Sequence, residues 1–166
     1  MELYILRHAI AVPRGTLLYP NDDRPLTKEG IAKMKDVAKG MHRVLPHLDA
    51  ILSSPLKRAR HTAEIVVDAL PFEGTIELCD QLLPGTPVSE VYSVLSGFRS
   101  NQKIMLVGHE PGLGLLVSSL LGAKGSVLEF KKGGLCALDV EKIPPAHPAI
   151  LLWHLTPRQL RLMGRT

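Results

Sequence analysis

Cysteine is scarce in this sequence: its 166 residues include only Cys79 and Cys136. Neither cysteine belongs to a Cys-x-x-Cys pair, and both stand in strand-like runs. We therefore expect two reduced, buried thiols rather than a disulfide framework or a cysteine-bound metal. The seven histidines likewise form no His-Glu-x-x-His or related spacing, so the sequence predicts no metal centre and no metal cofactor.

Long hydrophobic runs are also missing. No apolar stretch reaches the roughly 18 residues needed to cross a membrane, and a strand rather than a signal peptide is predicted from residue 2. We therefore expect a cytoplasmic protein without a membrane partner. The net charge of +4 is mild, and no stripe of Lys and Arg interleaved with aromatic residues indicates nucleic-acid binding.

What remains is a globular composition, with 45% apolar and 22% charged residues, typical of a soluble folded domain. A chain of 166 residues is long enough to bury a core and corresponds to one domain, which we place at residues 1–166. No internal repeat, low-complexity tract or linker divides the chain, and nothing in the sequence indicates an oligomeric state.

Apolar periodicity predicts that strands and helices alternate over the first two-thirds of the chain. The strands are expected at about 1–6, 49–53, 75–79 and 103–107. The helices are expected from an N-cap at Thr27 to residue 45, from Ser54-Pro55 to residue 70, over 87–95, and from Pro111 onward. Such alternation predicts an α/β fold, a three-layer α/β/α sandwich with a mainly parallel central sheet.

The last third of the chain departs from this alternation. We expect a hairpin of strands 126–130 and 135–140, with its turn at Lys132-Gly133-Gly134, then a strand over 149–155 and a short helix over 157–163. The tail is therefore predicted to add antiparallel strands to the sheet.

Cations and imidazoles stand at the ends of three predicted strands. Arg7 and His8 follow the first strand, Arg58 follows the second by a few residues, and His109 follows the strand at 103–107. In open α/β sheets, ligands bind outside the carboxyl ends of the strands. If the three strands are neighbours, these four side chains form a pocket for a phosphoryl group.

The residue types fit phosphoryl transfer, which requires a nucleophile and positive donors around the phosphoryl oxygens. Arg7 and Arg58 suit the donor role because a guanidinium binds phosphate oxygens bidentately. His8 is the candidate nucleophile, since a neutral imidazole can accept a phosphoryl group and pass it to water. Two arginines and a histidine supply the charge, so the site needs no metal.

The strand ends belong to longer motifs. They are Arg7-His8-Ala9, Ser53-Ser54-Pro55-Leu56-Lys57-Arg58-Ala59-Arg60-His61-Thr62-Ala63 and Val107-Gly108-His109-Glu110-Pro111-Gly112-Leu113, supported by Arg24–Gly30, Leu82–Gly85 and Lys131–Gly134. This set, in this order, resembles the histidine phosphatase superfamily, in particular its SixA-type phosphohistidine phosphatases. The resemblance covers nearly the whole chain. It implies a phosphoglycerate mutase-like fold, a phosphorylated nucleophile at His8, and phosphate binding by Arg7, Arg58 and His109.

The sequence departs from the superfamily pattern at two positions. Ala9 replaces the usual glycine after the Arg-His pair, a variation common in this branch. Gln81 stands where many members carry a glutamate acid, and an amide cannot donate a proton as an acid. Candidates for the acid or for a substrate contact are Asp22, Asp23, Arg24, Asp80 and Glu110. Each also has a structural explanation, in loop solvation, a turn or a helix entry.

The leading hypothesis is a metal-independent phosphatase that hydrolyses phosphohistidine on proteins, with a role in signal transduction. Only about ten residues separate the third strand from the next helix, so no cap domain is expected over the site, and a phosphorylated protein could enter. The alternatives are a phosphatase for a small phosphoester, such as a sugar or nucleotide phosphate, and a non-catalytic phosphate-binding protein. A mutase is disfavoured because it would need a cap to retain its intermediate.

Overall fold

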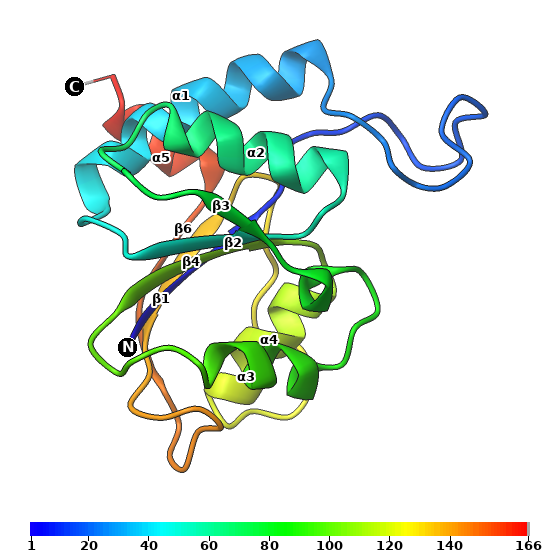
Figure 1. The fold of residues 1–166 in the computed structure, drawn as a ribbon. Coiled ribbons are helices and arrows are strands. Elements are labelled where there is room, and N and C mark those ends of the chain that lie inside the picture. Colours follow the sequence, from blue (N-terminus) through cyan, green and yellow to red (C-terminus); the bar gives the residue numbers. More distant parts are fainter. Residues whose placement is uncertain (166) are drawn as a thin grey trace.

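The computed structural model describes residues 1–165, which fold around one six-stranded sheet in the order β3-β2-β4-β1-β5-β6 (Figure 1). The strands are β1 (Glu2–Arg7), β2 (Ala50–Ser53), β3 (Ile76–Leu78), β4 (Lys103–Gly108), β5 (Leu135–Asp139) and β6 (Ile150–Leu155). The helices are α1 (Lys28–Val44), α2 (Lys57–Val67), the 3₁₀ helix η1 (Asp80–Leu82), α3 (Val88–Leu95), α4 (Gly112–Leu120) and α5 (Pro157–Met163).

The sheet is parallel where the chain alternates strand and helix, and antiparallel where it does not. Strands β3, β2, β4 and β1 pair in parallel, because a helical crossover returns the chain to the same edge before each new strand. Strands β5 and β6 pair antiparallel, β5 with β1 and β6 with β5. The predicted α/β sandwich with antiparallel strands in the tail is therefore confirmed.

Helices cover both faces of the sheet, with α1, α2 and α5 on one side and α3 and α4 on the other (Figure 1). Side chains of a strand point alternately to the two faces of the sheet, so β1 contributes to the hydrophobic core on both faces. Tyr4 and Leu6 pack toward α1 and α2, whereas Leu3 and Ile5 pack toward α3 and α4, and all four are buried.

Helix α1 begins as the sequence predicts, whereas α2 does not. Thr27 is the N-cap of α1, and its side chain accepts a hydrogen bond from the Gly30 backbone N–H. The prediction that Ser54 caps α2 is wrong: the helix starts at Lys57, after an extended Leu56. The Ser54 hydroxyl accepts a long hydrogen bond from the Leu56 N–H at 3.4 Å and lies 2.8 Å from His109 Nε2. A side chain that resembles a helix cap therefore makes a tertiary contact.

The predicted hairpin in the last third is also wrong. Residues 126–130 form no strand, and β5 has β1 on one side and β6 on the other. Both edges of β5 are therefore occupied, which leaves no edge for a further partner. Residues 126–130 are held instead by side chains: the Val127 N–H donates to Ser118 Oγ and the Phe130 N–H to Glu110 Oε1.

The segment between β1 and α1 projects from the body of the protein as a long loop (Figure 1). Its two ends are drawn together by a bridge between Ala11 and Leu26. Gly30 permits close contact there, since an added Cβ would lie 2.0 Å from the Ile10 carbonyl oxygen. Within residues 1–165, no inserted cap domain covers the carboxyl ends of the parallel strands, and no helix is both long and apolar enough to span a bilayer.

Candidate functional site

The carboxyl ends of β1, β2 and β4 lie level with one another, because the three strands are adjacent and in parallel register. Arg7 lies beside Gly108, and Ser53 beside Val107. The pairing continues one residue beyond each strand: the His8 N–H donates to the Gly108 carbonyl at 3.1 Å, and the Ser54 N–H to the Val107 carbonyl at 3.0 Å. The expected meeting of the three strand ends is therefore confirmed.

His8 is held neutral and in one tautomer. Its ring is buried, and Nδ1 lies 2.7 Å from the Ala9 carbonyl oxygen. A carbonyl only accepts, so Nδ1 carries the proton and Nε2 keeps its lone pair. Burial lowers the pKa of His8 to about 3. The nearby positive charges of Arg58, Arg7 and Lys132 add to this shift, whereas the hydrogen bond to Ala9 opposes it. His8 therefore has the protonation state of a nucleophile.

His109 lies against His8, with the ring centroids 5.0 Å apart. Its Nε2 is 2.8 Å from the Ser54 hydroxyl, while its buried Nδ1 has no hydrogen-bond partner. When Ser54 donates to Nε2, Nδ1 carries the proton and is free to donate to a ligand. Burial, followed by the charges of His8 and Arg58, lowers the pKa of His109.

Arg58 is the second residue of α2 and is 1% exposed. Two of its nitrogens are occupied: Nη1 donates to the Asp22 carbonyl at 2.6 Å, and Nη2 to Asp22 Oδ2 at 3.2 Å. Asp22 adopts a positive φ of 57°, uncommon for a residue with a side chain, so that backbone and carboxylate both face Arg58. The remaining nitrogen, Nε, is buried without a partner.

The Arg7 side chain is anchored by a single hydrogen bond to the backbone. Its Nη1 donates to the Phe130 carbonyl, and Phe130 is held in turn by Glu110, whose Oε1 accepts the Phe130 N–H at 2.9 Å. Glu110 Oε2 accepts the Gly114 N–H in the first turn of α4. The Nε of Arg7 is buried without a partner.

Three unpartnered buried N–H groups thus belong to residues near His8. Arg7 Nε, Arg58 Nε and His109 Nδ1 make up three of the five buried side-chain N or O atoms that lack a partner in the described chain. We call Arg7, Arg58 and His109 the donor cluster. Buried donors without partners are costly and call for an explanation. An oxyanion such as a phosphoryl group is the kind of ligand that guanidinium and imidazole donors bind.

Among the candidate acids, Asp22 contacts the donor cluster directly. Asp22 joins Arg58 to the buried Arg24, whose Nε donates to Asp22 Oδ1 at 2.7 Å. Burial alone would raise the pKa of Asp22, but the hydrogen bond from Arg24 and the charge of Arg58 outweigh it, and the net shift is downward. An ionised carboxylate between two arginines is a poor proton donor, so the structure favours a positioning role for Asp22.

The other candidate acids either bond backbone N–H groups or are exposed. Asp23 accepts the Lys57 backbone N–H at 2.8 Å, and this bond, outweighing partial burial, lowers its pKa. Asp80 is exposed in η1. Glu110 has both oxygens bound to backbone N–H groups. Gln81, at the position of the missing glutamate, borders a narrow gap next to His109.

Three neighbours of the cluster were not predicted from the sequence as site residues. Ser54 was interpreted as a cap, yet it bonds His109. Buried Thr62 accepts the Ala9 N–H and donates to the Arg58 carbonyl, joining β1 to α2. Lys132 lies in an exposed turn, as expected. The turn is tied to the end of β1, because the Gly133 N–H bonds the Arg7 carbonyl. Partial burial, with the charges of Arg7, Arg24 and Arg58, lowers the Lys132 pKa.

No cluster of three or more His, Cys, Asp or Glu side chains with the arrangement of a metal site occurs among residues 1–165. Cationic donors and imidazoles instead dominate the end of the sheet. Such an arrangement has the components to bind a phosphoryl group, attack its phosphorus and stabilise the charge that develops on its oxygens.

Comparison with known sequences identifies the family. The sequence model of the histidine phosphatase superfamily (branch 1) matches residues 3–82. An uncharacterised protein of Picosynechococcus is 37% identical over 142 residues, 83% of this chain and 84% of the relative. The phosphohistidine phosphatase SixA of Escherichia coli is 27% identical over 122 residues, 72% of this chain and 74% of the relative. The chain belongs to the histidine phosphatase superfamily.

Solved structures share its fold. The protein histidine phosphatase SixA complexed with tungstate has a TM-score of 0.84 at 23% identity, with 96% of this chain and 99% of that chain covered. A phosphoserine phosphatase of Entamoeba histolytica has a TM-score of 0.69 at 17% identity, with 96% and 98% covered. The fold is thus phosphoglycerate mutase-like, as the resemblance implied.

Proposed function

We propose that this protein is a metal-independent phosphatase that removes phosphate from phosphohistidine on proteins through a covalent intermediate on His8. The observation that carries the proposal is the donor cluster: three residues near a neutral histidine each keep a buried, unpartnered N–H group, and the Nε2 of that histidine is free. We propose further that residues 1–166 act as one histidine phosphatase domain, since the cluster draws on both the first half of the chain and His109.

In the first proposed step, the lone pair of His8 Nε2 attacks the phosphorus of the substrate. The bond from phosphorus to the leaving imidazole nitrogen breaks, and that nitrogen takes up a proton from solvent. Arg7, Arg58 and His109 donate to the phosphoryl oxygens, which gain charge in the transition state. Nδ1 of His8 keeps its proton and its bond to Ala9, so the ring becomes cationic only as its new P–N bond forms.

In the second step, water attacks the phosphorus of phosphorylated His8. The bond to Nε2 breaks, its electrons return to the ring, and inorganic phosphate leaves with the oxygen of water. The same donors serve both steps because the phosphoryl oxygens do not leave the site. Two guanidinium groups and an imidazole supply the charge stabilisation that a metal supplies in many other phosphatases.

None of the described carboxylates near the site is placed to protonate a leaving group, which favours a substrate whose leaving group needs little protonation. Asp22 and Asp23 have lowered pKa values, and Glu110 is bound on both oxygens. None of them is a ready acid, whereas an alkoxide leaving group needs a proton in the transition state. An imidazole leaving group needs less help, and the absence of a cap domain over the described site lets a protein-borne phosphohistidine approach.

The test is a substrate comparison on one enzyme preparation. A protein or peptide phosphorylated on histidine should be turned over with a higher kcat/KM than sugar and nucleotide monophosphates. A phosphoenzyme that is labile in acid and stable in base should be trapped on His8. Faster turnover of a sugar phosphate than of any phosphohistidine substrate would favour the second candidate, a small-phosphoester phosphatase, which the fold of the phosphoserine phosphatase supports. Absence of a phosphoenzyme together with tight phosphate binding would indicate a binding protein instead.

A further inference from the structure

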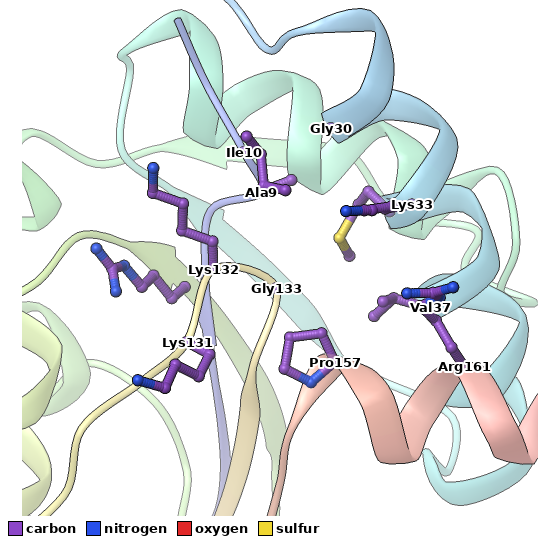
Figure 2. Close-up of a pocket in the computed structure, with 12 residues that line it drawn as sticks. Ala9, Ile10, Gly30, Lys33, Val37, Lys131, Lys132, Gly133, Pro157 and Arg161 are labelled. Carbon is purple, nitrogen blue, oxygen red and sulfur yellow. The ribbon is translucent and has the colours of Figure 1, made fainter. Parts of the chain in front are cut away.

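A second cationic site adjoins the donor cluster. A cavity of about 440 Å³ lies between α1, the loop after β1, the segment 131–133 and the start of α5 (Figure 2). We call it the basic cavity. Its volume is in the range of ligand sites in proteins. It touches the site already described through Arg7 and Ala9, the residues on either side of His8.

The lining combines an apolar floor with a basic rim. The floor consists of apolar side chains: Ala9, Ile10, Met34, Val37 and Pro157. The rim consists of basic side chains: Arg7, Lys33, Lys131, Lys132 and Arg161. No acidic side chain is among the described residues that line the cavity. Figure 2 shows Lys33 and Lys132 on opposite sides of the space, with Arg161 reaching toward it from α5.

Arg161 supplies an independent indication of a ligand. Its Nε is a fourth unpartnered buried N–H group of the described chain, in addition to the three of the donor cluster. Lys33 and Lys131 are exposed, and each pairs with a nearby exposed carboxylate, Glu29 and Glu129. Exposed pairs of this kind are weak, so an incoming anion can compete for these lysines. Charge complementarity therefore points to an acidic occupant.

We propose that the basic cavity binds an acidic segment of the phosphoprotein substrate, next to the phosphohistidine that enters the donor cluster. The inference rests on the proposed function, because it names the part of the protein that accompanies the scissile group. A glutamate side chain fits both features of the lining: its methylene groups pack on Met34 and Val37, and its carboxylate reaches Lys33 and Arg161. Arg7 borders both sites, so the two binding events are adjacent.

The test uses three peptides of one length, each phosphorylated on a central histidine and flanked by Glu, Gln or Lys. The wild-type protein should show a kcat/KM about tenfold higher for the Glu peptide than for the Gln peptide at low salt, because two charge contacts form. The Lys peptide should be the poorest substrate. The preference should shrink at about 0.5 M salt, where exposed charges are screened.

Variants at the cavity separate this inference from the proposed function. The double variant Lys33→Ala, Arg161→Gln should lose the Glu preference, chiefly through KM, and keep wild-type turnover of p-nitrophenyl phosphate, which does not reach the cavity. Lys35→Ala is the matched control, an exposed lysine on the same helix that does not line the cavity. It should retain the preference. If the double variant is unstable, Lys33→Glu alone should reverse the preference between the Glu and Lys peptides.

Three outcomes would overturn the inference, and they differ in meaning. If the wild type hydrolyses the three peptides equally well, the basic cavity binds no acidic segment, while the proposed function stands. If the wild type hydrolyses p-nitrophenyl phosphate but no phosphohistidine peptide, the proposed function is wrong and the inference fails with it. A preference that Lys35→Ala removes as fully as the double variant would also contradict a specific role for the cavity.

Discussion

The donor cluster and the basic cavity share Arg7, yet they hold their positive charges in opposite ways. In the donor cluster, Arg58 is buried and two of its nitrogens are held by Asp22. In the basic cavity, Lys33 and Lys131 are exposed and pair only with exposed carboxylates. Fixed, desolvated donors stabilise a transition state because they need no reorganisation. Exposed, adaptable cations are better suited to recognising a variable polypeptide.

Removal of the nucleophile should have the largest effect. His8→Ala deletes the side chain that forms the bond to phosphorus in the first step, so kcat should fall by roughly 10⁴-fold or more. Turnover of a phosphohistidine peptide and phosphoenzyme trapping measure this loss. His42→Ala, at an exposed position on α1, should be unaffected. Near-normal turnover by His8→Ala would refute the mechanism.

Loss of an arginine guanidinium from the donor cluster and from the basic cavity should have very different effects on turnover of a small substrate. Arg58→Ala removes a transition-state donor and should lower kcat for p-nitrophenyl phosphate by roughly 10²–10³-fold, the scale for one preorganised donor. Arg7→Ala should cost a similar factor. Arg161→Gln should stay within about twofold. Equal losses for Arg58→Ala and Arg161→Gln would show that the two regions do not differ in the way proposed.

The stability of the fold should depend on pH through the buried His8. Its pKa is about 3 in the folded protein and about 6.5 in an unfolded chain. The unfolded state therefore binds more protons as pH falls below about 6.5, and stability decreases. Between pH 7 and pH 5 this contribution amounts to about 2 kcal/mol. Urea unfolding at both pH values should show a smaller loss for His8→Ala than for the wild type, and equal losses would contradict the depressed pKa.

Asp22→Asn distinguishes a positioning carboxylate from an acid. If Asp22 holds Arg58 in place, the variant should lose about tenfold in kcat on phosphohistidine and on an alkyl phosphate alike. If Asp22 donates the proton, the alkyl phosphate should suffer far more, because its leaving group needs protonation. The measured quantity is the ratio of the two losses, and a ratio near one supports the positioning role. Asp23→Asn, whose carboxylate bonds Lys57, provides the control.

The smallest expected effect is that of a chelator. Guanidinium and imidazole donors supply the charge in the proposed mechanism, so EDTA should leave kcat and KM unchanged. The assay is turnover of a phosphohistidine peptide after exhaustive dialysis against EDTA, with and without added Mg²⁺. If EDTA inhibits the enzyme and a divalent cation restores its activity, the mechanism is metal-assisted and the donor cluster does not supply the charge by itself.

Much of the fold was predictable because it is encoded locally. Thr27 caps α1 as expected, and α5 occupies its expected range of 157–163. The meeting of Arg7, His8, Arg58 and His109 was also predictable, since parallel strands present their carboxyl ends at one edge. Ser54 was assigned wrongly because an N-cap and a tertiary hydrogen bond look alike in a sequence. The exposed turn at Lys132 was expected, but its tie to Arg7 was not, because a glycine-rich turn has the same composition whether or not it bonds a strand end.

By itself, the sequence determined the order of strands and helices, the faces they bury and the residue types at the strand ends. These features follow from side-chain periodicity and from turn and cap residues that act over a few positions. Only the tertiary structure decided that β5 pairs with β1 and β6 rather than with residues 126–130. It also placed Asp22 on Arg58 and opened a basic cavity beside Arg7. These contacts join segments that are distant along the chain, and competition among all available partners selects them.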